Sequence, residues 1–288
     1  MPALKNNRIK IGNSVLSAQI DCLGAQLRSL KKNGREVLWQ GAKGFWSESA
    51  PVLFPICGGL KDDKYILYGK EYTLEKHGFA CNLEFEGEKL SESSARFTLC
   101  SNDDTLKKYP YDFVFTVIFE IKDNTLVISY KTENKTDGFM YYSVGAHEGY
   151  ACPEGIEACE LIFNRDESFE TCLLDGGILS HEKQKLQADG RNIALKEEYF
   201  EVDAMIFEKV NSDSVTLVNR VSKNEITVDF GGFENLLIWS VPGARYVCIE
   251  PWSGFPDYSD TDGDFTKKNA IQKIPPHGTS VKTHTIIL

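Results

Sequence analysis

The sequence predicts an all-β protein in which two large antiparallel sheets pack as a β-sandwich. Segments with an apolar side chain at every second position run through the whole chain, and this period is typical of strands with one face in a core. Aromatic residues are abundant, with 17 Phe, 12 Tyr and 4 Trp, and such side chains pack well on a pleated sheet. Apolar residues at a helical spacing are scarce. The pattern predicts two packed layers but gives no order for the strands.

Two β-hairpins are predicted in the first part of the chain. In the first, over residues 26–40, Asn33-Gly34 separates two apolar stretches, and both residues accept the positive φ of a tight turn. In the second, over residues 64–74, the turn is Tyr68-Gly69-Lys70. Each hairpin pairs strands that are close in sequence.

The clearest strands lie in the middle of the chain. Residues 111–122 alternate, and the alternation resumes after a turn at Asp123-Asn124. The apolar positions of these two strands are Phe113, Phe115, Val117, Phe119, Ile121, Leu126, Ile128 and Tyr130. Further strands are predicted over residues 95–99, 139–145, 160–163, 214–219, 225–230, 236–241, 246–249 and 280–287. The polar segment 180–196 has no sustained apolar stripe and is expected to hold a short helix at most.

One domain is predicted over residues 1–288. A chain of this length buries a large core, and 42% hydrophobic with 26% charged residues is an ordinary globular composition. No linker rich in Pro, Gly or Ser and no internal repeat divides the sequence.

Charge and targeting signals narrow the classes of function. The net charge of −10 disfavours binding to nucleic acids and to anionic membrane surfaces. The first 21 residues contain no apolar run of signal-peptide length, and no later segment approaches the ~20 apolar residues of a membrane span. A cytoplasmic protein is therefore expected. The eight cysteines include no CxxC pair, which predicts free thiols packed as small apolar groups.

Motif searches predict no cofactor and no metal. The sequence lacks GxGxxG, GxxxxGK[ST], GxSxG and HExxH. The acidic segment 257–264 resembles the start of a calcium loop, but Gly263 is at the fourth position and Ile271 at the twelfth, so a solvated acidic loop is predicted. His147, Cys152 and Cys159 have no obvious fourth partner for zinc.

Four polar residues have surroundings that suggest a site. His77 and His147 lie among small residues, which leave room for a ligand, although a histidine satisfied in the core is the alternative for both. Glu250 follows the apolar strand 246–249, and a carboxylate in that place is either paired or functional because an unpaired buried charge is costly. Asp203 precedes an apolar run and is a weaker candidate. His181, His277 and His284 are expected to be structural or exposed.

These segments together resemble the aldose 1-epimerase (mutarotase) family, in particular its LacX-like branch. Each motif is short, but their order and spacing over nearly the whole chain are specific. The matching segments are Pro51-Val52-Leu53-Phe54-Pro55, Tyr68-Gly69-Lys70-Glu71-Tyr72 with His77-Gly78-Phe79-Ala80, Gly145-Ala146-His147, Asp203-Ala204 and Glu250-Pro251-Trp252-Ser253-Gly254.

The resemblance implies a galactose mutarotase-like supersandwich with a shallow sugar cleft, and an enzyme that interconverts the α and β anomers of a free aldose. It implies Glu250 as the general base at the anomeric hydroxyl and His147 as the general acid at the ring oxygen, with His77 and Asp203 on sugar hydroxyls. A carboxylate with an imidazolium suits this chemistry near neutral pH without a cofactor. Trp252 would pack on the sugar, or equally in the core.

The sequence departs from the family pattern at three positions. Gly59 and Cys81 stand where relatives commonly carry an arginine, and Glu148 stands where a proline is often found in this branch. Lys61 is a candidate replacement cation for sugar binding. The missing arginines disfavour a hexose-6-phosphate 1-epimerase and leave a non-catalytic carbohydrate-binding protein as the main alternative. The predicted partner is a small sugar, with no prediction of which aldose or which oligomeric state.

Overall fold

The computed structural model confirms the all-β prediction. It describes residues 7–201 and 203–288; positions 1–6, which belong to the stretch searched for a signal peptide, and position 202 lie outside it. About 50% of the chain is strand and 8% is helix. No helix in the described ranges is long and apolar enough to cross a membrane.

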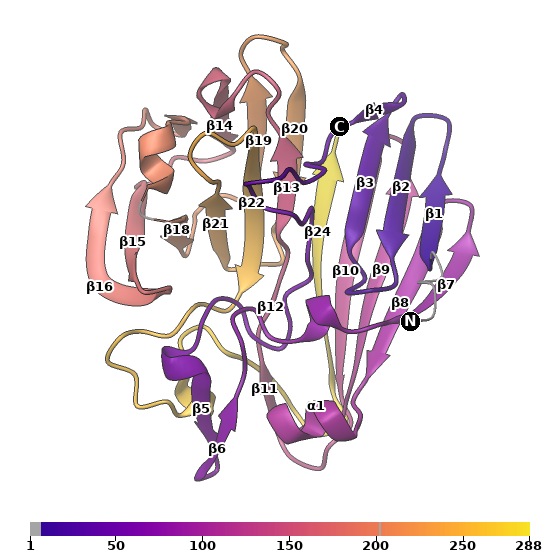
Figure 1. Cartoon of the computed structure of the whole chain (residues 1–288), viewed down its shortest axis with the longest axis vertical. Coiled ribbons are helices and arrows are strands. Elements are labelled where there is room, and N and C mark those ends of the chain that lie inside the picture. Colours follow the sequence, from indigo (N-terminus) through magenta and orange to yellow (C-terminus); the bar gives the residue numbers. More distant parts are fainter. Residues whose placement is uncertain (1–6, 202) are drawn as a thin grey trace.

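A nine-stranded antiparallel sheet forms one layer of the sandwich (Figure 1). Its order is β17-β14-β19-β20-β24-β10-β9-β8-β7. The strands are β7 (Glu86–Ser91), β8 (Ser94–Cys100), β9 (Phe113–Lys122), β10 (Thr125–Asn134), β14 (Cys159–Phe163), β17 (Asn192–Ala194), β19 (Ser214–Asn219), β20 (Glu225–Asp229) and β24 (Thr279–Ile287). The alternating apolar residues predicted for residues 111–130 are buried, which places them on the core face of β9 and β10.

Two smaller sheets form the opposite layer. A four-stranded sheet has the order β1-β2-β3-β4, and a five-stranded one has the order β12-β22-β21-β18 with β13 also paired to β22. Their strands are β1 (Arg8–Gly12), β2 (Leu16–Asp21), β3 (Leu27–Lys32), β4 (Arg35–Glu36), β12 (Val144–Gly145), β13 (Glu148–Ala151), β18 (Met205–Glu208), β21 (Asn235–Trp239) and β22 (Tyr246–Ser253). Side chains of both sheets share one buried apolar cluster with those of the nine-stranded sheet.

Short elements complete the fold. The remaining strands pair two by two as β5 (Lys64–Leu67) with β6 (Lys70–Thr73), β11 (Met140–Tyr142) with β23 (Gln272–Ile274), and β15 (Glu170–Asp175) with β16 (Ile178–Lys185). One α-helix, α1 (Asp103–Lys108), is present in the described chain, with 3-10 turns at Lys61–Asp63, Ala80–Asn82, Ile156–Ala158, Glu197–Phe200 and Phe265–Lys267. Both predicted hairpins are confirmed, with positive φ at Asn33, Gly34, Tyr68 and Gly69.

Two local features were not predicted. The segment 180–196, expected to hold a short helix at most, contains no helix and forms most of β16 and all of β17. Because β16 is mostly exposed, its sequence shows no apolar alternation. Conversely, α1 was not predicted. Asn102 caps this six-residue helix by accepting bonds from the backbone N–H groups of Asp104 and Thr105. A helix this short has too few turns to show an apolar stripe.

The register of β22 determines the site. Gly145 faces Trp252 and Glu148 faces Ile249, so with the same offset His147 lies opposite Glu250. Between β12 and β13, the pairing with β22 is interrupted beside Pro251, which has no N–H to donate. Contrary to the sequence prediction, Glu250 does not end its strand, because β22 continues to Ser253 with every side chain buried.

The acidic segment 257–264 is not uniformly solvated as predicted. The Asp257 carboxylate is buried and forms an ion pair with the Lys268 amine at 2.6 Å, their side chains being 5% and 3% exposed. Its other oxygen accepts a hydrogen bond from the backbone N–H of Lys61, and its own N–H donates to the Gly59 carbonyl. The pair therefore fixes the segment 58–61. The exposed Asp260 and Asp262 and the half-buried Asp264 form surface pairs instead.

Replacing Lys268 with Met is expected to destabilise the protein by about 3–5 kcal/mol, because it leaves the Asp257 carboxylate buried without its cation. Denaturant unfolding measures this change. The matched control is Lys267→Met, which removes an exposed lysine and should change stability little. Equal effects of the two substitutions would contradict the assignment.

Candidate active site

A cavity of about 550 Å³ opens over the five-stranded sheet. Its walls come from β18, β21 and β22, from the loops around residues 46–58 and 76–82, and from the turn after β15. Five of the six residues predicted from the sequence line it, namely His77, His147, Asp203, Glu250 and Trp252. Residues separated by up to 175 positions thus meet in one place.

Lys61, the sixth predicted residue, does not line the cavity. Its amine donates a hydrogen bond to the Ser259 carbonyl at 2.7 Å. The cation in the cavity wall is Lys76, next to His77. Sequence reasoning missed Lys76, although its place beside His77 was the available signal.

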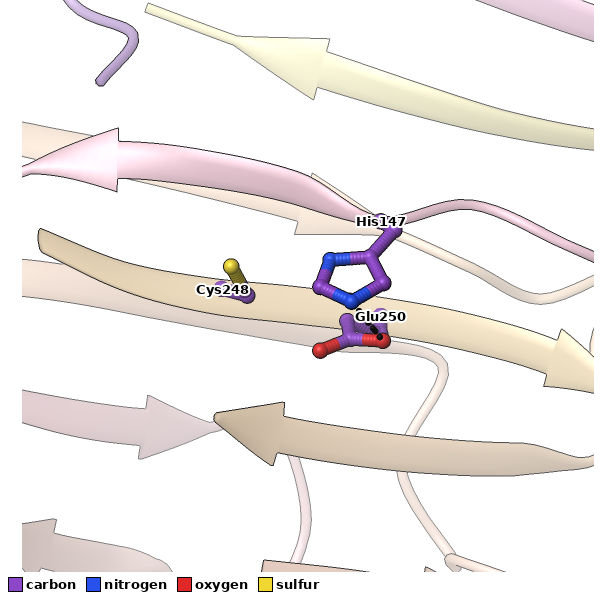
Figure 2. Close-up of side chains that lie close together, drawn as sticks. All are labelled: His147, Cys248 and Glu250. Carbon is purple, nitrogen blue, oxygen red and sulfur yellow. Dashed lines mark ion pairs between the residues drawn. The ribbon is translucent and has the colours of Figure 1, made fainter. Parts of the chain in front are cut away.

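His147 and Glu250 form the centre of the cavity floor. The imidazole Nε2 lies 3.4 Å from the Glu250 Oε2, and the Glu250 side chain is only 2% exposed (Figure 2). The two side chains meet because they are cross-strand partners on one face of the sheet. Glycines occupy the positions two before and two after His147: a Cβ at Gly145 would lie 2.6 Å from the Trp252 ring, and one at Gly149 would lie 2.8 Å from the Trp46 ring.

Burial shifts the pKa values of this pair in opposite directions. Loss of hydration raises the pKa of Glu250 well above its ordinary value. The positive charge of Lys76 lowers this pKa, whereas repulsion from Asp203 and Glu148 raises it further. Burial lowers the pKa of His147 to about 3, with a further decrease caused by Lys76. Between these pKa values the pair holds one proton, and burial favours the form in which Glu250 carries it.

Aromatic rings hold the His147 imidazole. Trp46 stacks on it with ring centroids 4.9 Å apart and an angle of 28° between the planes. His77 and Trp239 contact it edge-on, each at 5.6 Å. Its Nδ1 is buried and has no hydrogen-bond partner in the described part of the chain. The ring orientation therefore depends on this packing and on the backbone, rather than on a second hydrogen bond.

His77 is fixed as a neutral donor. Its Nδ1 accepts a hydrogen bond from the backbone N–H of Gly58 at 3.2 Å, which leaves the proton of the neutral ring on Nε2. Burial holds the pKa of His77 well below its ordinary value, and His147 and Lys76 lower it further. His77 and Asp203 both have positive φ, at 69° and 94°, in the tight segments that carry them to the cavity.

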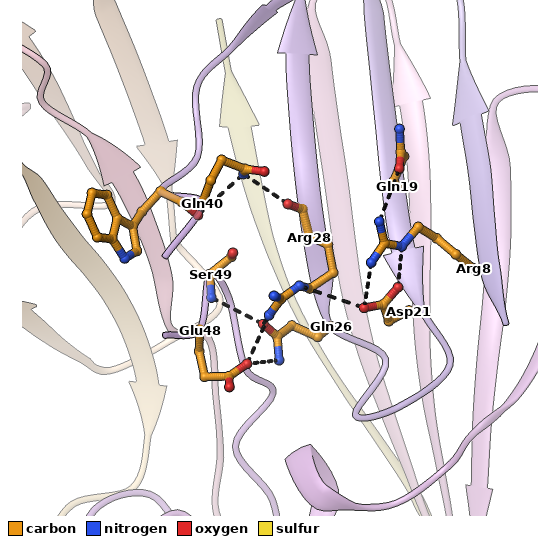
Figure 3. A network of polar contacts seen from close by, with 9 residues as sticks. Arg8, Gln19, Asp21, Gln26, Arg28, Gln40, Glu48 and Ser49 are labelled. Carbon is orange, nitrogen blue, oxygen red and sulfur yellow. Dashed lines mark hydrogen bonds and ion pairs between the residues drawn. The ribbon is translucent and has the colours of Figure 1, made fainter. Parts of the chain in front are cut away.

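A polar network supplies a wall that the sequence did not predict (Figure 3). Arg28 and the Gln26 amide both donate to the Glu48 carboxylate at 2.9 Å, and the Gln26 oxygen accepts from the backbone N–H of Ser49. Gln26 and Glu48 line the cavity. The predicted hairpin marked residues 26–40 as strand, but strand patterning gives no signal for a contact with residue 48.

Positions 59 and 81, where the resemblance leads to an expectation of arginine, differ in their surroundings. Cys81 lines the cavity, so a longer side chain there would enter it. Gly59 packs against the backbone of the turn after β15: a Cβ at this position would lie 3.2 Å from the Gly177 carbonyl oxygen. An arginine at position 59 would therefore require this turn to move.

Three potential metal donors lie close together at the pair. The ligand atoms of His147, Cys248 and Glu250 are within 4.8 Å of one another (Figure 2). This set differs from His147, Cys152 and Cys159, which the sequence analysis considered. Burial raises the pKa of the Cys248 thiol well above its ordinary value, with a further increase from Glu250. The site thus favours the protonated thiol, whereas zinc binds the thiolate.

The sequence profile of the aldose 1-epimerase family matches residues 7–271. The chain belongs to the aldose 1-epimerase family. This finding confirms the resemblance that the motifs indicated. The plasmid and chromosomal LacX proteins of Lactococcus lactis subsp. lactis are each 32% identical to it, over 97% of this chain and 99% of theirs.

Solved structures of the aldose 1-epimerase family have the same fold. A galactose mutarotase related enzyme from Lactobacillus acidophilus has a TM-score of 0.91 and 32% identity, covering 97% of this chain and 96% of its own. A galactose mutarotase-like protein from Lactobacillus casei has a TM-score of 0.90 and 26% identity, covering 97% and 99%. Galactose 1-epimerase from Lactobacillus acidophilus, at 14% identity, shares the fold with a TM-score of 0.73 over 97% and 93%.

Glu250→Gln is expected to raise the thermal stability of this family member at neutral and alkaline pH. The pKa of Glu250 is higher in the folded protein than in the unfolded chain. The folded protein is therefore most stable below the unfolded-state pKa, and its free energy of unfolding decreases as pH rises toward the folded-state pKa. The loss is about 1.4 kcal/mol per pH unit, or about 2–4 °C in Tm at this chain size. The amide has no such loss, so the Tm difference should grow from about pH 4.5 upward.

Thermal unfolding of both proteins across this pH range measures the effect. The matched control is Glu234→Gln, at a carboxylate that pairs with Lys282 near the surface. A Tm difference for Glu250→Gln that stays constant with pH would contradict the raised pKa.

Proposed function

We propose that this protein is a cofactor-independent aldose 1-epimerase that interconverts the α and β anomers of a free aldose. The observation that carries the proposal is the contact of the Glu250 carboxyl with the His147 imidazole at 3.4 Å on the floor of a cavity. Membership of the aldose 1-epimerase family supports it. The direct test is polarimetry or NMR of freshly dissolved α-glucose and α-galactose, with and without the protein.

The reaction requires one proton to leave and one to arrive. As a carboxylate, Glu250 takes the proton from the anomeric hydroxyl while the His147 imidazolium protonates the ring oxygen, and the C1–O5 bond breaks to give the aldehyde. Rotation about C1–C2 presents the other face of the aldehyde. Ring closure then returns both protons, with the roles of the two residues reversed. The total number of protons on the pair is one before and after each cycle.

The unliganded pair must first shift its proton. Burial favours a protonated Glu250 beside a neutral His147, and transfer of that proton between the two residues gives the carboxylate and imidazolium that the reaction uses. We infer that bound sugar hydroxyls promote this transfer, because donors and acceptors around the pair replace part of the hydration lost on burial.

Other cavity residues suit recognition of the sugar. His77, as a neutral Nε2–H donor, and Asp203, as an acceptor, would fix the pose through ring hydroxyls. Trp252 offers an apolar wall, and its Nε1–H is already used on the Ala146 carbonyl at 3.1 Å. Gln26 and Glu48 add polar groups at the opposite wall.

A carbohydrate-binding protein with little catalysis is the second candidate. The absence of arginine from the cavity-lining residues of the described chain favours it, because a guanidinium is a rigid fork of hydrogen-bond donors. The contact of His147 with Glu250 favours the enzyme, since sugar binding alone does not require an acid beside a base. Among the described residues that line the cavity, a hexose-6-phosphate 1-epimerase would have only Lys76 as a cation for the phosphate.

Substitutions should separate chemistry from binding. Glu250→Gln and His147→Asn keep the shape but remove a proton acceptor and a donor, so kcat should fall by ~10²-fold or more while sugar binding persists. His77→Asn and Asp203→Asn should raise KM, with a smaller effect on kcat. Steady-state kinetics beside a melting curve for each variant makes the comparison. Wild-type turnover by folded Glu250→Gln would refute the assignment.

Neutral hexoses should be better substrates than their 6-phosphates. The net charge of −10 repels a phosphate, and the cavity offers it one exposed lysine, so kcat/KM should be about tenfold or more higher for galactose than for galactose 6-phosphate. Competition kinetics measures the ratio. A preference for the phosphate that disappears in Lys76→Met would instead identify a phosphosugar epimerase.

A further inference from the structure

Glu148 is buried behind the candidate acid–base pair. Its side chain is 3% exposed. Glu148 lies opposite Ile249 on the core face of the five-stranded sheet, whereas its neighbour His147 faces the cavity. The proposed function uses no group on the core face, so the role of this carboxylate is unexplained by it.

Glu148 contacts a histidine of the opposite layer. Its Oε1 lies 3.3 Å from the Nε2 of His284, which is 1% exposed and lies in β24 of the nine-stranded sheet. The Tyr130 ring stacks on the His284 imidazole at 5.8 Å, and Phe233 meets it edge-on at 6.2 Å. The contact therefore joins the two layers of the sandwich and is enclosed by aromatic rings.

Stability does not explain such a pair. Moving a carboxylate and an imidazole into a core is costly, and an apolar pair of similar volume is commonly as stable or more so. The hydrogen bonding is also incomplete: within residues 7–201 and 203–288, Glu148 Oε2 and both His284 nitrogens have no hydrogen-bond partner. The pair therefore needs a reason other than stability.

The backbone around His147 provides that reason. On one side of His147, the Ala146 N–H donates to the Pro251 carbonyl at 3.0 Å and its carbonyl accepts from the Trp252 indole at 3.1 Å. The pairing with β22 is interrupted beside Pro251. On the other side of His147 it resumes at Glu148, which lies opposite Ile249. Because the Nδ1 of His147 lacks a partner, small shifts of this backbone turn the imidazole relative to Glu250.

We propose that Glu148 and His284 are positioning residues, whose contact across the two layers fixes the start of β13 and thereby the His147 imidazole against Glu250. The inference rests on the proposed function, because it assigns His147 a part in turnover. Glu148 also acts on the site electrostatically, as one of the groups that raise the pKa of Glu250.

Three variants test the proposal. Glu148→Gln keeps the shape and an oxygen that faces His284, and the double variant Glu148→Leu with His284→Leu replaces the pair with apolar side chains. The matched control is Tyr150→Phe, which removes a hydroxyl that is buried without a partner in the described chain, on the same strand and face as Glu148. Each protein is measured for Tm and for kcat and KM with α-galactose.

The double variant should fold with a Tm at or above that of the wild type, yet lose about tenfold or more in kcat with KM changed less than about threefold. Glu148→Gln should keep kcat within about threefold, because the amide preserves the contact, and Tyr150→Phe should match the wild type. A stable double variant with wild-type kcat would overturn the proposal. A double variant that does not fold, or an equal loss of kcat in Glu148→Gln, would also overturn it.

A second readout does not require turnover. Histidine-selective ¹³C and ¹⁵N NMR reports the environment of the His147 ring, whose signals should shift or broaden in the double variant and remain unchanged in Tyr150→Phe. If the wild type does not catalyse anomerisation, the proposed function fails, and these spectra still decide the positioning role. Unchanged His147 signals in the double variant would overturn it.

Discussion

The site depends on one constraint, the register between β22 and the strand pair β12–β13. That register places His147 opposite Glu250, and the period of two then fixes the neighbours on both faces. On the cavity face, Gly145 and Gly149 leave space for the rings of Trp252 and Trp46. A slip of β22 by one residue would move Glu250 into the core and turn Val247 and Ile249, which are fully buried, toward the cavity.

Burial determines the pKa values of the pair and also lowers the stability of the fold. The charged forms of a carboxyl and an imidazole are both poorly hydrated at this depth, which is why the pKa of Glu250 rises and that of His147 falls. Because the pair is buried, sugar hydroxyls and the charges nearby have a larger effect than they would in solution. The surrounding sheets supply the stability that this arrangement removes.

The sequence predicted what depends on local patterns. The strands with buried alternate residues and the hairpins at Asn33-Gly34 and Tyr68-Gly69 follow from neighbours in the chain. The family resemblance brought together the five candidate residues that line the cavity. It could not predict contacts between distant polar residues, such as Arg28 with Glu48, Asp257 with Lys268, or Lys61 with Ser259. Such pairs have no period, so only the folded chain reveals them.

The charges that act on Glu250 come from both faces of its sheet. In the cavity lining of the described chain, Lys76 supplies the positive charge, and it is exposed enough to be hydrated. Less positive charge near Glu250 favours its protonated form, and Glu148 on the far side of the strand acts in the same direction. Groups on both faces of the sheet therefore act on the proton balance of the pair, and the contact of Glu148 with His284 links the buried face to β24.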